Sequence, residues 1–223
     1  MTVPVQPSAA TTALVYPAEA TPAGAALILA HGAGGDQRSS FMVTFAKALS
    51  ALGLDILTFN FLYTEQRRRV PDRTPLLETC YRAVIDVAAR EIDRGRGSLF
   101  IGGKSMGGRI ATHVAAADSR LPVRGVVLLG YPLHPPGRPA ERRDAHLPAV
   151  GQPMLFIQGS RDPFGAPAEF DGLLETLAPR ADLHVVDGGD HSFKVRKEQA
   201  AVDRAIQQRI AEWVKRVLSQ REN

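Results

Sequence analysis

Three short segments carry the residue types that nucleophilic catalysis needs. "GGKSMGG" holds Ser105 between glycines, "GSRDPFG" contains Asp162, and "GGDHSF" contains His191. A serine hydroxyl is a poor nucleophile until a base accepts its proton, and a histidine acts as that base when an acid orients its ring. The chain order Ser, Asp, His therefore predicts attack on a carbonyl carbon through a covalent acyl intermediate.

The sequence around Ser105 fits a nucleophile elbow, the sharp turn between a strand and a helix. The apolar run "SLFI" precedes the turn, and a segment of helical period follows it. Gly103 and Gly107 stand two residues before and two after the serine, where strand and helix approach too closely for larger side chains. We predict that Ser105 projects from this turn as the nucleophile.

The same segment could instead be the end of a phosphate-binding loop. That loop requires Gly-x4-Gly-Lys-Ser/Thr, and the position five before Gly103 is Ser98. Residues 98–101 also belong to the predicted strand, so no loop remains to surround a phosphate. "GAGGDQ" fails as a dinucleotide fingerprint because Gln37 replaces its third glycine. Nucleotide binding is therefore disfavoured.

The chain has six histidines, so the assignment of the base needs a choice. His191 follows an apolar run and precedes the last predicted helix, which is the expected place for the base. His134 and His146 stay open as rivals. The others have structural interpretations: His31 shapes a glycine-rich loop, His113 lies within a helix and His184 within a strand. Among the acids, Asp36 and Asp187 are interpreted as turn residues, Asp190 is expected to point away from the neighbouring His191, and Asp162 is interpreted as the catalytic acid.

A tetrahedral intermediate needs two backbone N–H donors for its oxyanion. Met106 follows the nucleophile and opens a helix, so it is the first predicted donor. The second comes from "HGAGG", with Ala33 preferred and Gly34 as the alternative. Gly34, Tyr63 and His134 are also predicted to contact substrate. This chemistry requires no metal and no organic cofactor.

Apolar runs alternate with segments of helical period, which predicts an α/β fold with a mostly parallel sheet covered by helices on both faces. The predicted strands are 25–30, 54–61, 98–101, 123–130, 153–159 and 181–186, with an edge strand near 13–16. The predicted helices are 40–52, a segment after Thr74-Pro75, 105–117, 168–177 and 198–219. We expect one domain over 1–223, with 1–12 loosely ordered.

All the candidate motifs directly follow predicted strands. In an open parallel sheet, the carboxyl ends of the strands meet at one edge, where ligands bind. The serine, acid and histidine segments are therefore expected to converge there.

Composition places few limits on partners. The net charge of +4 comes from 27 basic and 23 acidic residues among 223, too small an excess to indicate nucleic-acid binding. Cys80 is the one cysteine, which rules out an internal disulfide and is compatible with a reducing compartment. No apolar run approaches the ~18 residues of a membrane span. A cytoplasmic monomer or homodimer acting on a small acyl substrate is the default expectation, without nucleic acid or membrane.

Two loops suggest limits on the substrate. Only about twenty residues separate the strand ending at Gly130 from the one starting at Pro153, which leaves no room for a helical lid and favours short acyl chains. Arginines lie in this insert and in the loop after Asn60: Arg138, Arg142, Arg143 and Arg67–Arg69. They suggest a weaker bias toward anionic substrates, although solvated surface is the slightly favoured interpretation.

The ordered motifs "HGAGGD", "GGKSMGGR", "GSRDPFG" and "DHSF" resemble those of α/β-hydrolases over nearly the whole chain. Within that superfamily the chain is similar to small dienelactone-hydrolase-like proteins without a cap domain. This subgroup also resembles a histone acetyltransferase complex subunit and a testis-expressed protein. The resemblance implies an eight-stranded sheet, a triad of Ser105, Asp162 and His191, and an oxyanion hole at Ala33 and Met106. True dienelactone hydrolases use cysteine as nucleophile, which argues against a dienelactone substrate here.

These observations predict a serine hydrolase, of carboxylesterase or thioesterase type, that cleaves a small carboxylic ester or thioester. Two alternatives remain open: a peptidase or amidase with the same triad, and a non-catalytic interaction module with this fold.

Overall fold

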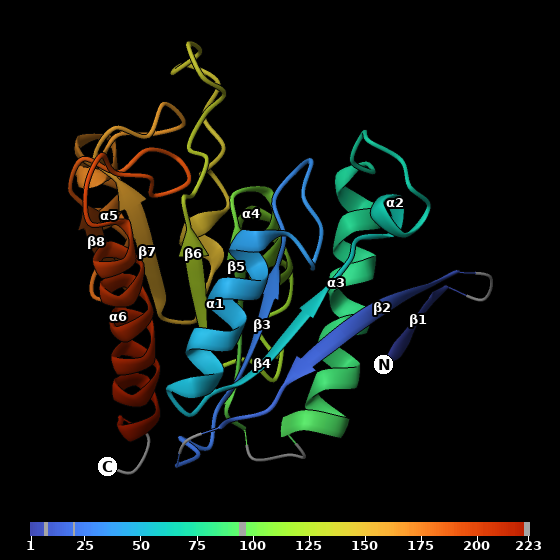
Figure 1. Ribbon diagram of the computed structural model, residues 1–223. Helices are drawn as coiled ribbons and strands as arrows, with labels where there is room; N and C mark the ends of the chain where they lie inside the picture. The colour runs from blue at the N-terminus through green and yellow to red at the C-terminus, as the bar shows by residue number, and fades with distance from the viewer. Residues whose placement is uncertain (7–8, 20, 94–96, 221–223) are drawn as a thin grey trace.

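The computed structural model describes residues 1–6, 9–19, 21–93 and 97–220, and within them eight strands form one sheet in the order β1-β2-β4-β3-β5-β6-β7-β8 (Figure 1). The strands are β1 Thr2–Gln6, β2 Ala9–Tyr16, β3 Ala26–Ala30, β4 Asp55–Phe59, β5 Leu99–Lys104, β6 Gly125–Leu129, β7 Met154–Gly159 and β8 Ala181–Val186. β4, β3 and β5 to β8 run parallel, whereas β1 and β2 are antiparallel additions at one edge. The predicted mostly parallel sheet is confirmed.

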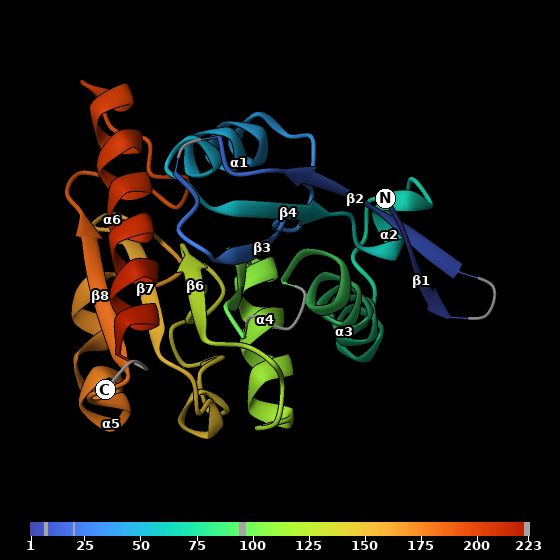
Figure 2. The same cartoon turned by 90° about the horizontal axis from the view of Figure 1, so that it is seen from below.

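Helices cover both faces of this sheet (Figure 2). One face carries α1 Ser40–Ala51 and α6 Gln199–Ser219; the other carries α3 Thr74–Ala88, α4 Met106–Ala117 and α5 Asp171–Leu177. Short helical segments complete the described chain: α2 Leu62–Glu65, Ala89–Asp93, Leu147–Ala149 and Pro167–Phe170. The five long helices match the predicted ones to within a few residues.

The core consists of two buried clusters, one on each face of the sheet. In β3, Leu27 and Leu29 pack toward α1 and α6, whereas Ile28 and Ala30 pack toward α3 and α4. This alternation follows from the two-residue period of a strand. Because both faces are covered, the central strands β3 and β6 are apolar along their whole length.

The described part of the N-terminal segment differs from the loose order expected over 1–12, since β1 and β2 pair there as antiparallel strands. Val3 in β1 and Ala13 in β2 are fully buried, and exposed or half-buried residues flank each of them along its strand. The edge strand predicted near 13–16 is the second half of β2, and the first half was missed because its alternating pattern relies on alanine and threonine, which are weakly hydrophobic. Pro4 is tolerated because β1 is an edge strand.

The segment between β6 and β7 contains no cap domain in this fully described part of the chain. Its one regular element is the turn of helix at Leu147–Ala149. The site at the carboxyl ends of the strands is therefore not enclosed by a lid, as predicted. Among the described residues, no helix combines the length and hydrophobicity needed to cross a membrane.

Candidate active site

Ser105 occupies the turn between β5 and α4, with φ 50° and ψ −114°. A positive φ is strained for a residue other than glycine, and it directs the serine side chain out of the sheet edge. A Cβ on Gly103 or on Gly107 would lie 2.4 Å from the Ala30 carbonyl oxygen. Both positions therefore require glycine, and the predicted elbow geometry is present.

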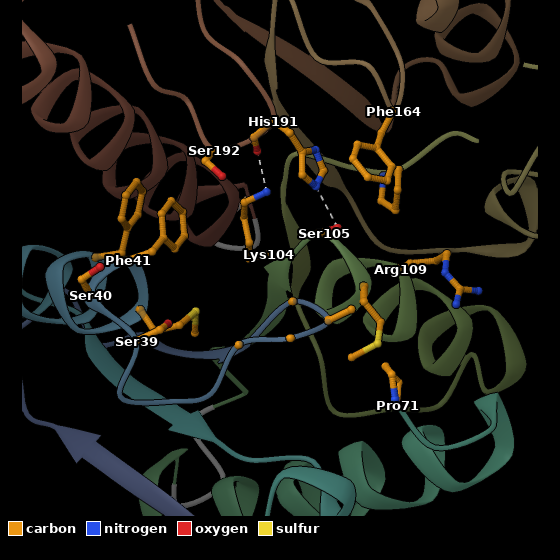
Figure 3. Close-up of a pocket in the computed structure, with 18 of the residues that line it drawn as sticks. Ser39, Ser40, Phe41, Pro71, Lys104, Ser105, Arg109, Phe164, His191 and Ser192 are labelled. Carbon is orange, nitrogen blue, oxygen red and sulfur yellow. Dashed lines mark hydrogen bonds between the residues drawn. The ribbon is translucent and has the colours of Figure 1, made fainter. Parts of the chain in front are cut away.

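A continuous chain of hydrogen bonds joins Ser105, His191 and Asp162. The His191 Nε2 atom lies 2.9 Å from Ser105 Oγ, and Nδ1 lies 2.8 Å from Asp162 Oδ2 (Figure 3). The buried Asp162 carboxylate also accepts hydrogen bonds from Gln158 Nε2 at 2.8 Å and Phe164 N at 2.9 Å. The Phe164 ring stacks on the imidazole with centroids 4.2 Å apart. The imidazole is thus held on two sides.

This arrangement allows proton transfer from Ser105 to His191. An Asp162 carboxylate that accepts the Nδ1–H of His191 leaves Nε2 free to accept a proton. The atom beside Nε2 is Ser105 Oγ, so the histidine can take the serine proton during attack on a carbonyl.

The residues 31–35, "HGAGG", form a loop beside the serine, which we call the oxyanion loop. A Cβ on Gly32 would lie 3.5 Å from Ser105 Cβ. The buried His31 ring fixes this loop, because Nδ1 lies 2.8 Å from Gly32 O while Phe61 N donates to Nε2 at 3.2 Å. Burial lowers the pKa of the His31 imidazole, which favours its neutral form. Because Nε2 accepts a hydrogen bond from Phe61 N, the proton of the neutral ring belongs on Nδ1. Its predicted loop-shaping role fits these contacts.

Ala33 and Met106 both line the cavity that contains Ser105. Met106 is the first residue of α4, so its N–H has no acceptor within the helix. The two predicted oxyanion donors therefore belong to segments that meet at the nucleophile.

The cavity has a volume of about 890 Å³ and extends to both sides of Ser105 (Figure 3). One side is formed at the start of α1, by Ser39, Ser40 and Phe41. The other side is formed by Pro71, Arg109 and Phe164. A substrate cleaved at the serine can thus place one part on each side.

Of the three residues predicted to contact substrate, one lines the cavity and two do not. Gly34 lines the cavity, but Tyr63 and His134 are absent from its described lining. Tyr63 is fully buried and packs edge-on against His31, with centroids 6.0 Å apart. His134 is buried with Nε2 at 2.9 Å from Glu169 Oε2. Both residues follow strands as predicted, but their side chains face the protein interior.

The rival base His146 and the neighbouring acid Asp190 have other contacts. His146 Nε2 lies 2.8 Å from Thr112 Oγ1 and its ring lies 4.0 Å from that of His113. Asp190 Oδ1 accepts hydrogen bonds from the backbone N–H groups of Ser192 and Lys194, which makes it a turn residue. Among the histidines, His191 is the one placed at hydrogen-bond distance from the serine.

One of the arginines considered from the sequence, Arg143, lines the cavity. The others are exposed or have carboxylate partners: Arg67 and Arg69 are exposed, Arg68 pairs with Asp72, Arg138 with Glu141 and Arg142 with Asp144. The sequence analysis missed Arg109, which also lines the cavity. The sequence could have indicated it, because Arg109 lies four residues after Ser105, about one turn along α4, and a side chain there is on the same side of the helix as the serine.

Lys104 is a second residue that the sequence analysis left without a role. It is buried, lines the same cavity, and donates a hydrogen bond to the backbone carbonyl of His191. The described residues include no group of three or more His, Cys, Asp or Glu side chains that could hold a metal ion.

An eight-stranded, largely parallel sheet with an elbow serine at its carboxyl edge defines the α/β-hydrolase class. Residues 23–219 match the family model described as the alpha/beta hydrolase domain, so the chain belongs to this family.

Solved structures share the fold at low sequence identity. A protein from Xanthomonas campestris, described as an a/b serine hydrolase without lid, has a TM-score of 0.73 and 23% identity; the match covers 96% of this chain and 93% of that one. The dienelactone hydrolase from Anabaena variabilis has a TM-score of 0.74 and 23% identity, over 93% of this chain and 94% of that one. The chain is thus similar in fold to lidless and dienelactone-hydrolase-like members.

Curated relatives are longer than this chain. A Mycobacterium tuberculosis protein named "Putative phosphoribosyl transferase" is 33% identical over 174 residues, which cover 75% of this chain and 36% of the relative. The protein named "Thioesterase frbD", from Dothideomycetidae sp., is 28% identical over 155 residues, 61% of this chain and 56% of the relative. The chain therefore spans about a third to a half of the length of these two relatives.

Proposed function

We propose that this chain is a serine hydrolase that cleaves a small carboxylic ester or thioester. The observation that carries the proposal is the continuous Ser105–His191–Asp162 hydrogen-bond chain at a lidless cavity. Ser105 acts as nucleophile, His191 as general base and acid, and Asp162 as the orienting carboxylate.

The proposed reaction has two halves. Ser105 Oγ attacks the carbonyl carbon while His191 Nε2 takes its proton, and the N–H groups of Ala33 and Met106 bind the oxyanion. The tetrahedral intermediate collapses, and His191 returns the proton to the leaving alcohol or thiol. Water then attacks the acyl-enzyme, again with His191 as base, and releases the acid and free Ser105. No step requires a metal or an organic cofactor.

The relatives support this class of reaction without naming the substrate. One curated relative carries the name of a thioesterase, and the fold is shared with a serine hydrolase without lid. The phosphoribosyl transferase name belongs to a protein of which this chain matches only 36%, and it supports no activity here. The proposal extends to one domain over 1–223, acting in the cytoplasm as a monomer or homodimer on a small-molecule acyl substrate, without nucleic acid or membrane.

Short acyl chains are expected to be the better substrates. The loop between β6 and β7 forms no lid, so a long chain extends into solvent beyond the cavity. Each additional CH₂ contributes about 0.8 kcal/mol only while it becomes buried. The measurement is kcat/KM across p-nitrophenyl acetate, butyrate, octanoate and palmitate, which should reach a plateau or decline after the short esters. A steady rise to palmitate would reject the argument from the missing lid.

A modest preference for anionic esters is expected from Arg143. Arg143 lines the cavity, whereas its neighbour Arg142 is paired with Asp144. Replacing Arg143 with glutamine should therefore reduce kcat/KM for the p-nitrophenyl monoester of glutaric acid by up to about fivefold, the effect of one exposed ion pair of at most ~1 kcal/mol. The neutral p-nitrophenyl pentanoate should be little affected.

The Arg142→Gln variant is the matched control for this experiment. It removes the same charge one residue away, so an equal loss in both variants would indicate a general field effect and contradict a direct contact. The difference between the two esters should also shrink at high salt, because ions screen exposed charges.

A further inference from the structure

Lys104 and Ser105 are consecutive residues that contact His191 at its two ends. Ser105 Oγ lies 2.9 Å from the ring atom Nε2, and the Lys104 ammonium donates to the His191 backbone carbonyl at 2.5 Å (Figure 3). The lysine is the last residue of β5, and its side chain is buried. The end of β5 therefore positions the nucleophile, Ser105, and also contacts the backbone of the base, His191.

An aromatic ring and a glycine form the surroundings of the Lys104 ammonium. Lys104 Nζ lies 5.6 Å from the centroid of the buried Phe193 ring, within the range of a cation–π contact. Gly130 has φ +64°, and a Cβ there would lie 2.9 Å from Lys104 Nζ and 3.0 Å from His191 O. The glycine leaves the space in which ammonium and carbonyl meet.

His191 needs such support because of where it lies. It belongs to residues 187–193, "DGGDHSF", which we call the histidine loop and which follow the edge strand β8. Internal hydrogen bonds, such as that of Phe193 N to Asp190 O at 2.9 Å, shape this loop. The Lys104 contact fastens the loop to a central strand, 87 residues away in the chain.

We propose that Lys104 is a positioning residue, whose ammonium fixes the histidine loop so that the His191 imidazole stays in register with Ser105. This inference rests on the proposed hydrolase function, but it concerns a residue outside the triad. A hydrogen bond from a charged donor is about twice as strong as a neutral one, and small misplacements of a base are costly in rate.

The charge of the lysine makes its role dependent on pH. Burial lowers the pKa of Lys104 to about 8, and the charges of Asp162 and Asp190 oppose this shift. The His191 imidazole also lies near the ammonium, since a Cβ on Gly130 would lie 2.9 Å from Lys104 Nζ and 3.4 Å from His191 Cε1. Activity should decline as pH rises through about 8, because the contact to the carbonyl loses its charge.

Stability should move in the opposite direction. The unfolded lysine keeps its proton up to about pH 10.4, whereas the folded one releases it near 8. The unfolded state therefore binds more protons in this window, so the contribution of Lys104 to the free energy of unfolding rises with pH. Because the contribution of Lys104 to stability rises with pH, unfolding caused by Lys104 cannot explain a loss of activity above pH 8, whereas misplacement of His191 can.

The test compares Lys104→Met with wild type and with Lys197→Met. Methionine keeps a buried apolar stem without the ammonium, and the exposed Lys197 provides a control that removes the same charge. On p-nitrophenyl acetate at pH 7, Lys104→Met should lose up to about 10²-fold in kcat with little change in KM. Lys197→Met should keep wild-type kcat.

Three readouts distinguish positioning from a purely structural role. Lys104→Met should lack the decline of kcat/KM near pH 8 that wild type shows. Its fluorophosphonate labelling should slow in parallel with kcat, and the low-field NMR signal of the proton between His191 and Asp162 should broaden or shift. If methionine prevents folding, Lys104→Gln keeps a neutral N–H donor and should show intermediate kcat without the alkaline decline.

An unchanged kcat in the folded Lys104 variant, with the decline near pH 8 retained, would overturn the inference. The same holds if kcat falls only as far as the folded fraction falls. A wild-type protein that neither hydrolyses esters nor reacts with fluorophosphonate would instead contradict the proposed function, so the two failures are distinguishable.

Discussion

Replacing Ser105 with alanine is expected to lower kcat for a short p-nitrophenyl ester by about 10³-fold or more. The substitution removes the atom that forms the acyl-enzyme, and among the described side chains Ser105 is the one at hydrogen-bond distance from His191 Nε2. The remaining rate comes from the oxyanion hole and from binding. Steady-state kinetics on the purified variant measure the effect.

The fold should survive this change, because alanine is smaller than serine and the buried core does not include Ser105. Circular dichroism and thermal unfolding should therefore match wild type. The control is Ser119→Ala, an exposed serine after α4 at the opposite edge of the sheet, which should keep full activity. Wild-type turnover in Ser105→Ala would exclude this serine as nucleophile.

Replacing Asp162 with asparagine is expected to lower kcat by up to about 10⁴-fold near neutral pH. Either orientation of the new amide removes the negative charge that stabilises the imidazolium. With its NH₂ group toward His191, the amide also forces Nδ1 to accept, which places the proton on Nε2 and leaves no base for Ser105. The measurement is kcat on the same ester, with thermal unfolding as the test of fold.

The identity of the base is checked in the same assay. His191→Ala should be as damaging as Asp162→Asn or more so. His134→Ala and His146→Ala should retain most of the activity, since these rings contact Glu169 and Thr112 rather than Ser105. If either variant loses as much as His191→Ala, the base is assigned to the wrong residue.

The central part of the fold could be predicted because its signals are local. A continuous apolar run marks a strand covered on both faces, and glycines at fixed distances from a serine mark a turn that admits no larger side chain. The convergence of Ser105, Asp162 and His191 then follows from topology, since all three come after parallel strands. These features needed no knowledge of side-chain packing.

Other features depend on which way a side chain points, and the sequence does not encode that locally. Tyr63 and His134 follow strands, as substrate contacts would, yet both side chains turn into the interior. Lys104 had no role once the phosphate-binding loop was rejected, because its contact with the His191 carbonyl, 87 residues away, is visible only in the structure. β1 was missed, and β2 was predicted only near 13–16, because Thr and Ala give its first half a weak alternating pattern.

Covalent labelling tests the central claim most directly. The protein would be treated with a fluorophosphonate probe, digested, and the modified residue located by mass spectrometry. The account predicts one labelled site, Ser105, with labelling abolished in Ser105→Ala and slowed in His191→Ala. Labelling at Ser39, Ser40 or Ser192, which line the same cavity, or ester hydrolysis that persists without any labelled serine, would contradict it.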